Sequence, residues 1–246
     1  MLRRLLAVAA AFACLAALPA LADADPRYEK LCGAAGHPDW AFGDAKTTPY
    51  EYRPLFGCDD RPGFWHKRDR TYVNRLRKLG YSDADLGTLL AEQGWVWLKK
   101  KEPALAMRRL NLAFEYAPWN GDIYHGIALA MSQGGLPHDM VGYWYAVAAN
   151  QKAGRPERFA DYGRFLIATG QFEKAVPVLE KSRGLLPDDT WTLMNLTQSY
   201  FATKRKPEAC GAVKLLGRSE PPEGYDATRY GIVVDHWEER AEKEGC

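Results

Sequence analysis

The chain of 246 residues lacks the short motifs that mark the common enzyme and cofactor families. It contains no HExxH zinc motif, no CxxCH haem motif, no GxSxG nucleophile turn and no GK[ST] phosphate loop. Its paired carboxylates have no obvious acid or base partner, and Asp residues in turns and at helix starts usually act as caps. These pairs are Asp59–Asp60, Asp83/Asp85 and Asp188–Asp189. The sequence therefore predicts a protein that is not an enzyme and binds no cofactor.

Long apolar runs are also scarce, and the one that stands out lies at the start of the chain. Arg3 and Arg4 precede an apolar run from Leu5 to Leu18, and Ala20-Leu21-Ala22 follows it before Asp23. A basic flank, a short apolar run and a small-residue cleavage site are typical of a secretory signal peptide. The run is shorter than the roughly 20 residues that a membrane-spanning helix needs. We expect residues 1–22 to be removed, the mature chain to begin at Asp23, and the product to be periplasmic or secreted without a membrane span.

An excess of one charge is absent as well. The chain has 33 Lys and Arg against 31 Asp and Glu, a formal net charge of +2. Removing residues 1–22 removes Arg3 and Arg4 and no acid, so the net charge falls from +2 to 0. A neutral chain is not expected to bind nucleic acid through its bulk charge.

Cysteine is rare, but the residues present after residue 22 form an even set: Cys32, Cys58, Cys210 and Cys246. An exported protein reaches an oxidising compartment, where cysteines tend to pair. Sequence separation suggests the pairs Cys32–Cys58 and Cys210–Cys246, although three connectivities are possible.

The sequence does contain self-similarity at 34 to 35 residues. Ala106, Val141, Ala175 and Ala209 fall 35, 34 and 34 residues apart. The segment 156–187 holds two amphipathic helical patterns joined by a Gly and closed by a Pro. Such a hairpin cannot bury its apolar faces alone, so the period indicates stacked helical repeats.

The pattern resembles the tetratricopeptide repeat, whose motif asks for a bulky residue, a small residue, an aromatic, then Ala, a bulky residue, Ala and Pro. The first copy reads Leu90, Gly94, Trp97, Ala106, Leu110, Ala113, Pro118; the third reads Phe159, Gly163, Leu166, Ala175, Leu179, Ser182, Pro187; the fourth reads Leu193, Thr197, Tyr200, Ala209, Val213, Leu216, Pro221. The second and weakest copy offers Tyr124, Ala128, Met131, Val141, Trp144 or Tyr145, and Ala148, and it lacks the Pro near residues 152–154. The resemblance implies an all-α fold, a right-handed α-solenoid of about four helical hairpins.

The regions around the repeats complete the expected organisation. Residues 23–80 are expected to form an irregular, disulfide-linked segment followed by a helix over 64–79, with Trp65, Tyr72, Leu76 and Leu79 on its apolar face. Ser82 to Asp85 resembles a capping box that opens the repeats of residues 81–221. Residues 222–246 should hold a capping helix from Asp226 to Lys243, because a repeat array otherwise exposes its last stacking face.

Binding residues follow from the resemblance, since the first helix of each repeat commonly lines a concave groove that holds a peptide. The residues that this implies as partner contacts are Trp95, His125, Arg164, Trp191, Gln198 and Phe201. Their types suit an extended segment with apolar side chains and one acidic group. Alternatively, Trp95 and Trp191 are packed between helices.

The expected helix before the repeats is basic. It carries Lys67, Arg68, Arg70, Arg75, Arg77 and Lys78. This face could dock an acidic partner or anionic lipid head groups, or it could simply be solvated, which the neutrality of the chain favours.

The sequence as a whole therefore predicts an exported adaptor or scaffold for an envelope or secreted complex. The alternative is a metal-binding or enzymatic segment at residues 23–80, presented on a repeat platform. Its candidate ligands are Cys32, His37, Cys58 and His66, since thiolate and imidazole suit zinc. Their irregular spacing and the exported context favour disulfides.

Overall fold

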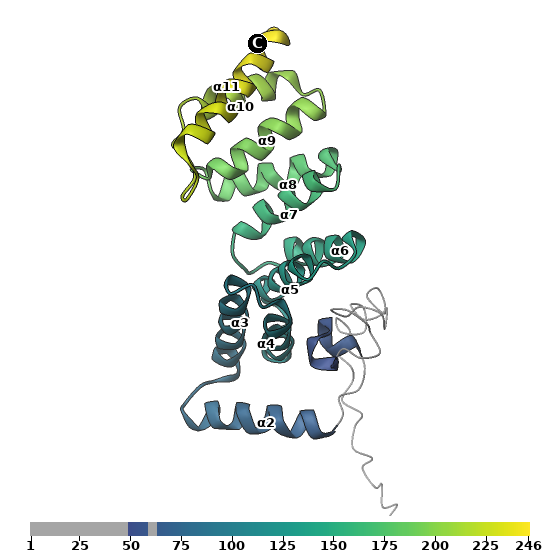
Figure 1. Ribbon diagram of the computed structural model, residues 1–246. Coiled ribbons are helices and arrows are strands. Elements are labelled where there is room, and N and C mark those ends of the chain that lie inside the picture. The colour runs from purple at the N-terminus through teal and green to yellow at the C-terminus, as the bar shows by residue number, and fades with distance from the viewer. Residues whose placement is uncertain (1–48, 59–62) are drawn as a thin grey trace, which may run out of the picture. The chain divides into compact units, whose positions relative to one another are not determined.

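The computed structural model describes residues 49–58 and 63–246, which all belong to one unit, His37–Cys246 (Figure 1). These ranges hold two 3-10 helices and ten α-helices. They are η1 (Tyr50–Tyr52), η2 (Pro54–Cys58), α2 (Gly63–Lys78), α3 (Asp83–Lys99), α4 (Pro103–Tyr116), α5 (Gly121–Gln133), α6 (His138–Asn150), α7 (Glu157–Ala168), α8 (Phe172–Leu185), α9 (Thr190–Ala202), α10 (Lys206–Leu216) and α11 (Ala227–Lys243). The described ranges contain no β-strand, only an isolated bridge between Asn120 and Ala153. The all-α prediction is confirmed.

The helices pack as sequential antiparallel pairs. α3 packs on α4, α5 on α6, α7 on α8, and α9 on α10, as Figure 1 shows. Each pair contacts the next through its second helix, in the contacts α4–α5, α6–α7 and α8–α9, and α11 packs on α10. This arrangement confirms the four predicted hairpins and the last helix, and it is consistent with a helical repeat.

The backbone repeats with the period that the sequence shows. The turn inside each hairpin contains one residue with left-handed φ, namely Lys101 (59°), Gly135 (71°), Gly170 (73°) and Lys204 (57°). These positions fall 34, 35 and 34 residues apart. The N–H of the next residue closes each turn on a carbonyl five residues earlier, in the bonds Glu102→Trp97, Leu136→Met131, Gln171→Leu166 and Arg205→Tyr200. This is the Schellman geometry that ends a helix, and all four hairpins use it.

Small residues lie where the two helices of a hairpin cross, as predicted. A Cβ on Gly163 would lie 2.2 Å from Leu179 Cδ2, and one on Gly94 would lie 2.8 Å from Leu110 Cγ. Helices can approach this closely only where one of them lacks a side chain. In the fourth hairpin Thr197 takes the small position, fully buried, with its hydroxyl donating to the Leu193 carbonyl at 2.9 Å.

The second hairpin has the weakest sequence pattern, yet its predicted core positions are all buried. They are Tyr124, Ala128, Met131, Val141, Trp144, Tyr145 and Ala148, each at most 3% exposed. The missing Pro after this hairpin has a substitute in Arg158, whose guanidinium donates to the carbonyls of Gln151, Gly154 and Arg155. A side chain thus fixes the connection that a Pro fixes elsewhere.

The predicted helix over 64–79 is α2, but its apolar face differs from the expectation. Val73 is 2% exposed and belongs to that face, whereas Leu79 is 71% exposed, so its assignment was wrong. The reason is that α2 ends at Lys78 and the chain turns at Gly80, which has a φ of 94°. Tyr72 donates a hydrogen bond to Gln93 Oε1 at 3.1 Å and so links α2 to α3. The side chain of Trp65 lies outside the described part of the chain.

Part of the expected irregular segment is fixed on α4 by Asn111, which is fully buried. Its amide donates to the carbonyls of Glu51 (3.0 Å) and Arg53 (2.7 Å) and accepts from the N–H of Leu55 (2.9 Å). Because buried polar groups need partners, this one side chain sets the path of η1 and η2.

The C-terminal helix covers the last hairpin as predicted. Asp226 caps α11, and the ring of Trp237 stacks on Phe201 with centroids 5.4 Å apart. Cys210 and Cys246 form the predicted disulfide, with Cα atoms 5.5 Å apart. The other expected pair, Cys32–Cys58, and the expected signal peptide lie outside the residues whose side chains are described. None of the described helices is long and apolar enough to cross a membrane.

Candidate functional site

The first helices of neighbouring hairpins pack on one another at two of the three junctions, α3 on α5 and α7 on α9, whereas α5 and α7 make no contact of that extent. Within the described ranges, the second helices of neighbouring hairpins make no comparable contact. We call the side formed by α3, α5, α7 and α9 the first-helix surface. The sequence places its candidate binding residues here.

Arg155, in the connection before α7, contacts the first helices of the first two hairpins on this surface. Its guanidinium lies over the ring of Trp95, 4.5 Å from the centroid. The same group pairs with Glu92 of α3, and its Nε lies 3.4 Å from Asp122 Oδ2 of α5. The charge of Arg155 is therefore shared between two carboxylates of the chain itself.

His125 continues the network to the third hairpin. Its Nε2 lies 2.8 Å from Asp161 Oδ2, and its ring meets Trp95 edge-on with centroids 4.9 Å apart. The His125 side chain is 1% exposed, so a ligand cannot reach it directly. His125 is thus a positioning residue that connects α3, α5 and α7.

Asp161 carries the charge at the centre of this site. Burial raises the pKa of its carboxyl, but the hydrogen bond from His125 and the pairing with Arg164 outweigh burial and hold that pKa below its usual range. Burial raises the pKa of the nearby Tyr145 phenol, so Tyr145 is neutral at physiological pH. The site therefore presents an ionised carboxylate beside the Arg164 guanidinium, whose side chain is 52% exposed.

Two cavities meet at Asp161 and Arg164. The first, of about 460 Å³, opens between the second hairpin and α7; it is lined by Leu129, Ser132, Gly135, Leu136, His138, Val141, Tyr145, Asp161, Arg164, Phe165, Ala168 and Thr169. The second, of about 330 Å³, opens between α7 and α9; it is lined by Glu157, Ala160, Asp161, Arg164, Leu186, Asp189, Trp191 and Asn195. The Asp161–Arg164 pair thus lies between two hollows whose walls are both mainly apolar.

The structure brings together some of the predicted contact residues and separates others. Trp95, His125 and Arg164 belong to the network, and Trp191 borders the second cavity with its ring 5.0 Å from Tyr225. Gln198 is half-buried on α9. Phe201 is 4% exposed under Trp237, so it offers a partner almost no surface.

Sequence reasoning missed Glu92, Arg155 and Asp161. A signal existed for Asp161, which lies 36 residues after His125, about one repeat further along. Residues one period apart lie on neighbouring first helices, so this spacing could have indicated the contact.

No family model matches this chain, and no curated protein matches its sequence. The indication of a repeat is therefore the shared period of the residues and of the backbone turns.

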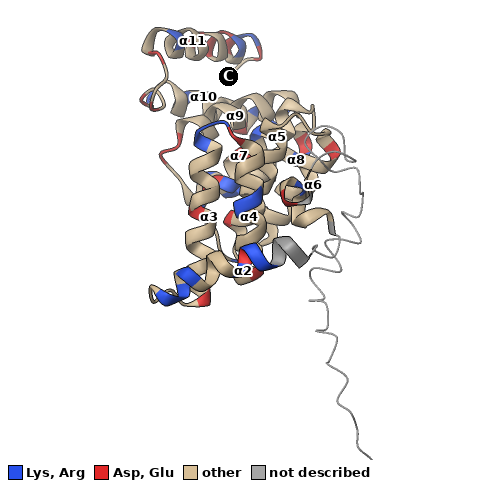
Figure 2. Ribbon diagram, turned by 60° about the horizontal axis from the view of Figure 1, so that its bottom comes forward, with Lys and Arg blue, Asp and Glu red and all other residues tan. Residues whose placement is uncertain are grey.

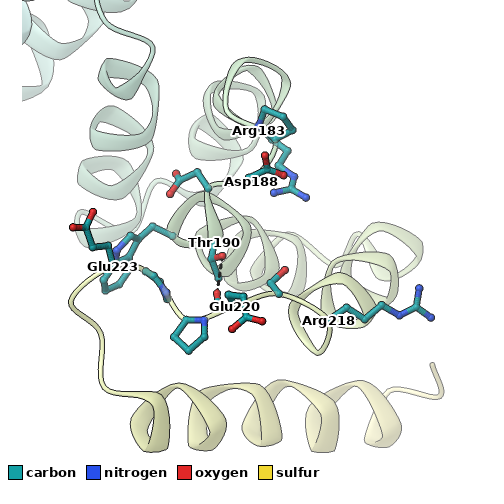
Figure 3. A pocket seen from close by; sticks show the side chains of 12 residues that line it. Arg183, Asp188, Thr190, Arg218, Glu220 and Glu223 are labelled. Carbon is teal, nitrogen blue, oxygen red and sulfur yellow. Dashed lines mark hydrogen bonds between the residues drawn. The ribbon is translucent and has the colours of Figure 1, made fainter.

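A third cavity, of about 710 Å³, lies between the α8–α9 turn and the connection from α10 to α11 (Figure 3). Its labelled side chains carry both charges: Arg183 and Arg218 against Asp188, Glu220 and Glu223. The hydroxyl of Thr190 donates to the Glu220 carbonyl at 3.0 Å and joins the two loops. We assign this cavity no role.

The described side chains contain no group of three or more His, Cys, Asp and Glu placed to hold a metal. The alternative metal ligands are not among them, since Cys32 and His37 and the side chains of Cys58 and His66 lie outside the described part. The metal hypothesis for residues 23–80 stays a prediction.

Proposed function

We propose that this protein is an exported adaptor or scaffold of the tetratricopeptide type, a right-handed solenoid of four hairpins whose first-helix surface binds an extended peptide segment. Four in-phase hairpins with the same turn geometry support the repeat assignment. The Cys210–Cys246 disulfide supports export, because disulfides persist in oxidising compartments.

The observation that carries this proposal is the pair of cavities on either side of Asp161 and Arg164. Their position along successive first helices suits a ligand that runs across several repeats and places neighbouring side chains in neighbouring hollows. The network of Trp95, His125 and Arg155 holds the helices that form these walls. A site whose walls are already fixed requires little ordering on binding, which favours affinity.

The ion pairs refine the expected ligand. Arg155 and Arg164 each have carboxylate partners in the chain, so an acidic group on the ligand must compete with Asp161 for Arg164. The walls of the first cavity supply apolar contact through Leu136, Tyr145 and Phe165. Apolar and aromatic side chains of the partner should therefore provide most of the binding energy.

The test separates binding from stability. Trp95→Ala and Arg164→Ala are each measured for melting temperature and for recovery of the partner from envelope extract. Arg205→Ala is the matched control, because Arg205 is also an exposed Arg paired with carboxylates but lies at the N-cap of α10, a second helix. The proposal is supported if Trp95→Ala and Arg164→Ala, but not Arg205→Ala, reduce recovery of the partner by more than their melting temperatures explain. Unchanged recovery in both variants rejects the first-helix surface.

A further inference from the structure

The exposed face of α2 carries charge of one sign only. The exposed residues from 67 to 79 are Lys67, Arg70, Thr71, Asn74, Arg75, Arg77, Lys78 and Leu79. Five of these are cations and none is an acid, while the single acid of the helix, Asp69, is 7% exposed on the opposite face. Figure 2 shows the basic segments along α2.

Exposure to solvent alone does not explain the single sign of charge on this face. The exposed face of α11, in the same chain, carries both signs. The exposed residues of α11 include acids and bases, and the ion pairs Lys243–Glu239 and Arg240–Glu244 join them one turn apart. Figure 2 shows both colours mixed on α11. A helix face that contacts only water can carry either acidic or basic side chains. The restriction of the exposed α2 face to basic side chains therefore indicates a negatively charged partner.

Four of the α2 cations are available to such a partner. Arg77 is paired with Asp83 at 2.6 Å. Lys67, Arg70, Arg75 and Lys78 take part in no ion pair recorded for the described residues. Unneutralised charges on an exposed helix attract an anionic surface over about a Debye length, roughly 8 Å at physiological salt.

Shape and apolar exposure favour a lipid surface over an acidic peptide. The face belongs to one exposed helix, which suits a flat partner better than a strand that needs a groove. A hollow of about 460 Å³ along it is lined by Lys67, Arg68, Thr71, Tyr72 and Arg75, mostly through the apolar parts of these side chains. At its end Leu79 is 71% exposed and Tyr81 is 39% exposed, next to Lys78. Basic residues followed by exposed apolar and aromatic ones are typical of segments that lie on anionic membranes.

We propose that this face of α2 docks the protein on a membrane surface rich in anionic phospholipids, with Lys67, Arg70, Arg75 and Lys78 on the headgroup phosphates and Leu79 at the interface. The docking surface is separate from the first-helix surface and does not depend on the function proposed for it. Electrostatic attraction supplies most of the binding free energy, so the affinity for the membrane decreases as the salt concentration increases.

The experiment measures partitioning of the exported, N-terminally processed protein onto phosphatidylcholine vesicles with and without phosphatidylglycerol, over a range of salt. The test variant replaces Lys67, Arg70, Arg75 and Lys78 by Gln. The matched control replaces four exposed lysines elsewhere, Lys152, Lys174, Lys206 and Lys214, by Gln and removes the same charge. A third variant, Leu79→Ser, probes the apolar contact.

We expect salt-sensitive binding to the phosphatidylglycerol vesicles alone. The α2 variant should lower the partition coefficient by up to about one-thousandfold, since each of the four basic residues near an anionic surface strengthens binding about fivefold. The lysine control should keep most of the binding, and Leu79→Ser should lower it to a smaller extent than the α2 variant. Equal losses in the α2 variant and the control, or no binding to anionic vesicles at low salt, would overturn the proposal. Loss of an acidic protein from a pull-down by the α2 variant, without any vesicle binding, would assign the face to a protein instead.

Discussion

His125 Nε2 and Asp161 Oδ2 lie 2.8 Å apart, and this contact joins the first helix of the second hairpin to that of the third. Asp161 also borders both cavities of the first-helix surface. The same carboxylate therefore contributes to the stability of the array and to the shape of its candidate site.

Asp161 should make stability depend on acid pH. Its pKa in the folded chain is lowered, so its contribution is complete above the unfolded pKa, about 3.9, and is lost as the pH falls through the lower folded value. We expect Asp161→Asn to lower the melting temperature at neutral pH. Below about pH 4, the melting temperature of this variant should fall less steeply with decreasing pH than that of the wild type. Asp235→Asn, at an exposed carboxyl on α11, controls for the loss of one charge. If the melting temperatures of Asp161→Asn and wild type changed with pH in the same way, the His125–Asp161 contact would contribute nothing to stability.

Gly163 should tolerate no large side chain. A Cβ there would lie 2.2 Å from Leu179 Cδ2, and Leu179 is fully buried and cannot move away freely. We expect Gly163→Leu to lower the free energy of unfolding by about 3 kcal/mol, measured by urea denaturation. Gly211→Leu is the matched control, because nothing lies within 4 Å of a Cβ at that position on α10. Equal changes in the free energy of unfolding for both substitutions would contradict a close crossing of α7 and α8 at Gly163.

The hairpin turns should prefer Gly at their left-handed position. Lys204 has a φ of 57° where the third hairpin uses Gly170. Lys204→Gly should therefore raise the free energy of unfolding by about 1 kcal/mol, and Gly170→Lys should lower it by about the same amount. Lys214→Gly, inside α10, should instead lower it, because Gly weakens a helix interior by about 1 kcal/mol. A loss of stability in Lys204→Gly would contradict the shared turn geometry.

The sequence was sufficient for the hairpins, because each depends on local patterns that recur. Apolar spacing placed the helices, Gly94 and Gly163 marked the close crossings, and Ser82 with Asp85 formed the predicted capping box. The weak second hairpin was still located, since its neighbours fixed the phase.

Contacts between hairpins could not be predicted in the same way. The Arg155 network joins residues up to 63 positions apart, and no local pattern specifies which acid a basic residue will meet. Asn111 similarly holds a segment 56 to 60 residues earlier in the chain, and nothing in the sequence around it indicates that role. Phe201 matched the groove position by resemblance, but α11 covers it through Trp237. These outcomes depend on tertiary packing, which a pattern within one repeat does not specify.

The Cys210–Cys246 disulfide should stabilise the C-terminal helix on the last hairpin. It closes a loop with a sequence separation of 36, for which the chain-entropy estimate is about 3 to 4 kcal/mol. We expect the double substitution Cys210→Ser and Cys246→Ser to lower the free energy of unfolding by this amount. Alkylation of the wild-type protein without reduction, followed by mass spectrometry, checks the bridge itself. A Cys246 thiol that alkylates without reduction would contradict the pairing.

Site-specific photo-cross-linking from the first-helix surface is the most direct test of peptide binding there. A photoreactive residue is placed at Ala160 or Asn195, which line the second cavity, and at Gly184 or Gly211 on second helices, where a Cβ meets nothing within 4 Å. Only variants with the same melting temperature are compared. Each is irradiated in envelope extract, and the cross-linked peptides are identified by mass spectrometry. The account predicts one partner segment joined at Ala160 and Asn195, with adjacent stretches of that segment at the two positions, and none at Gly184 or Gly211. Cross-links of equal yield from the second helices, or none from the first, would contradict it.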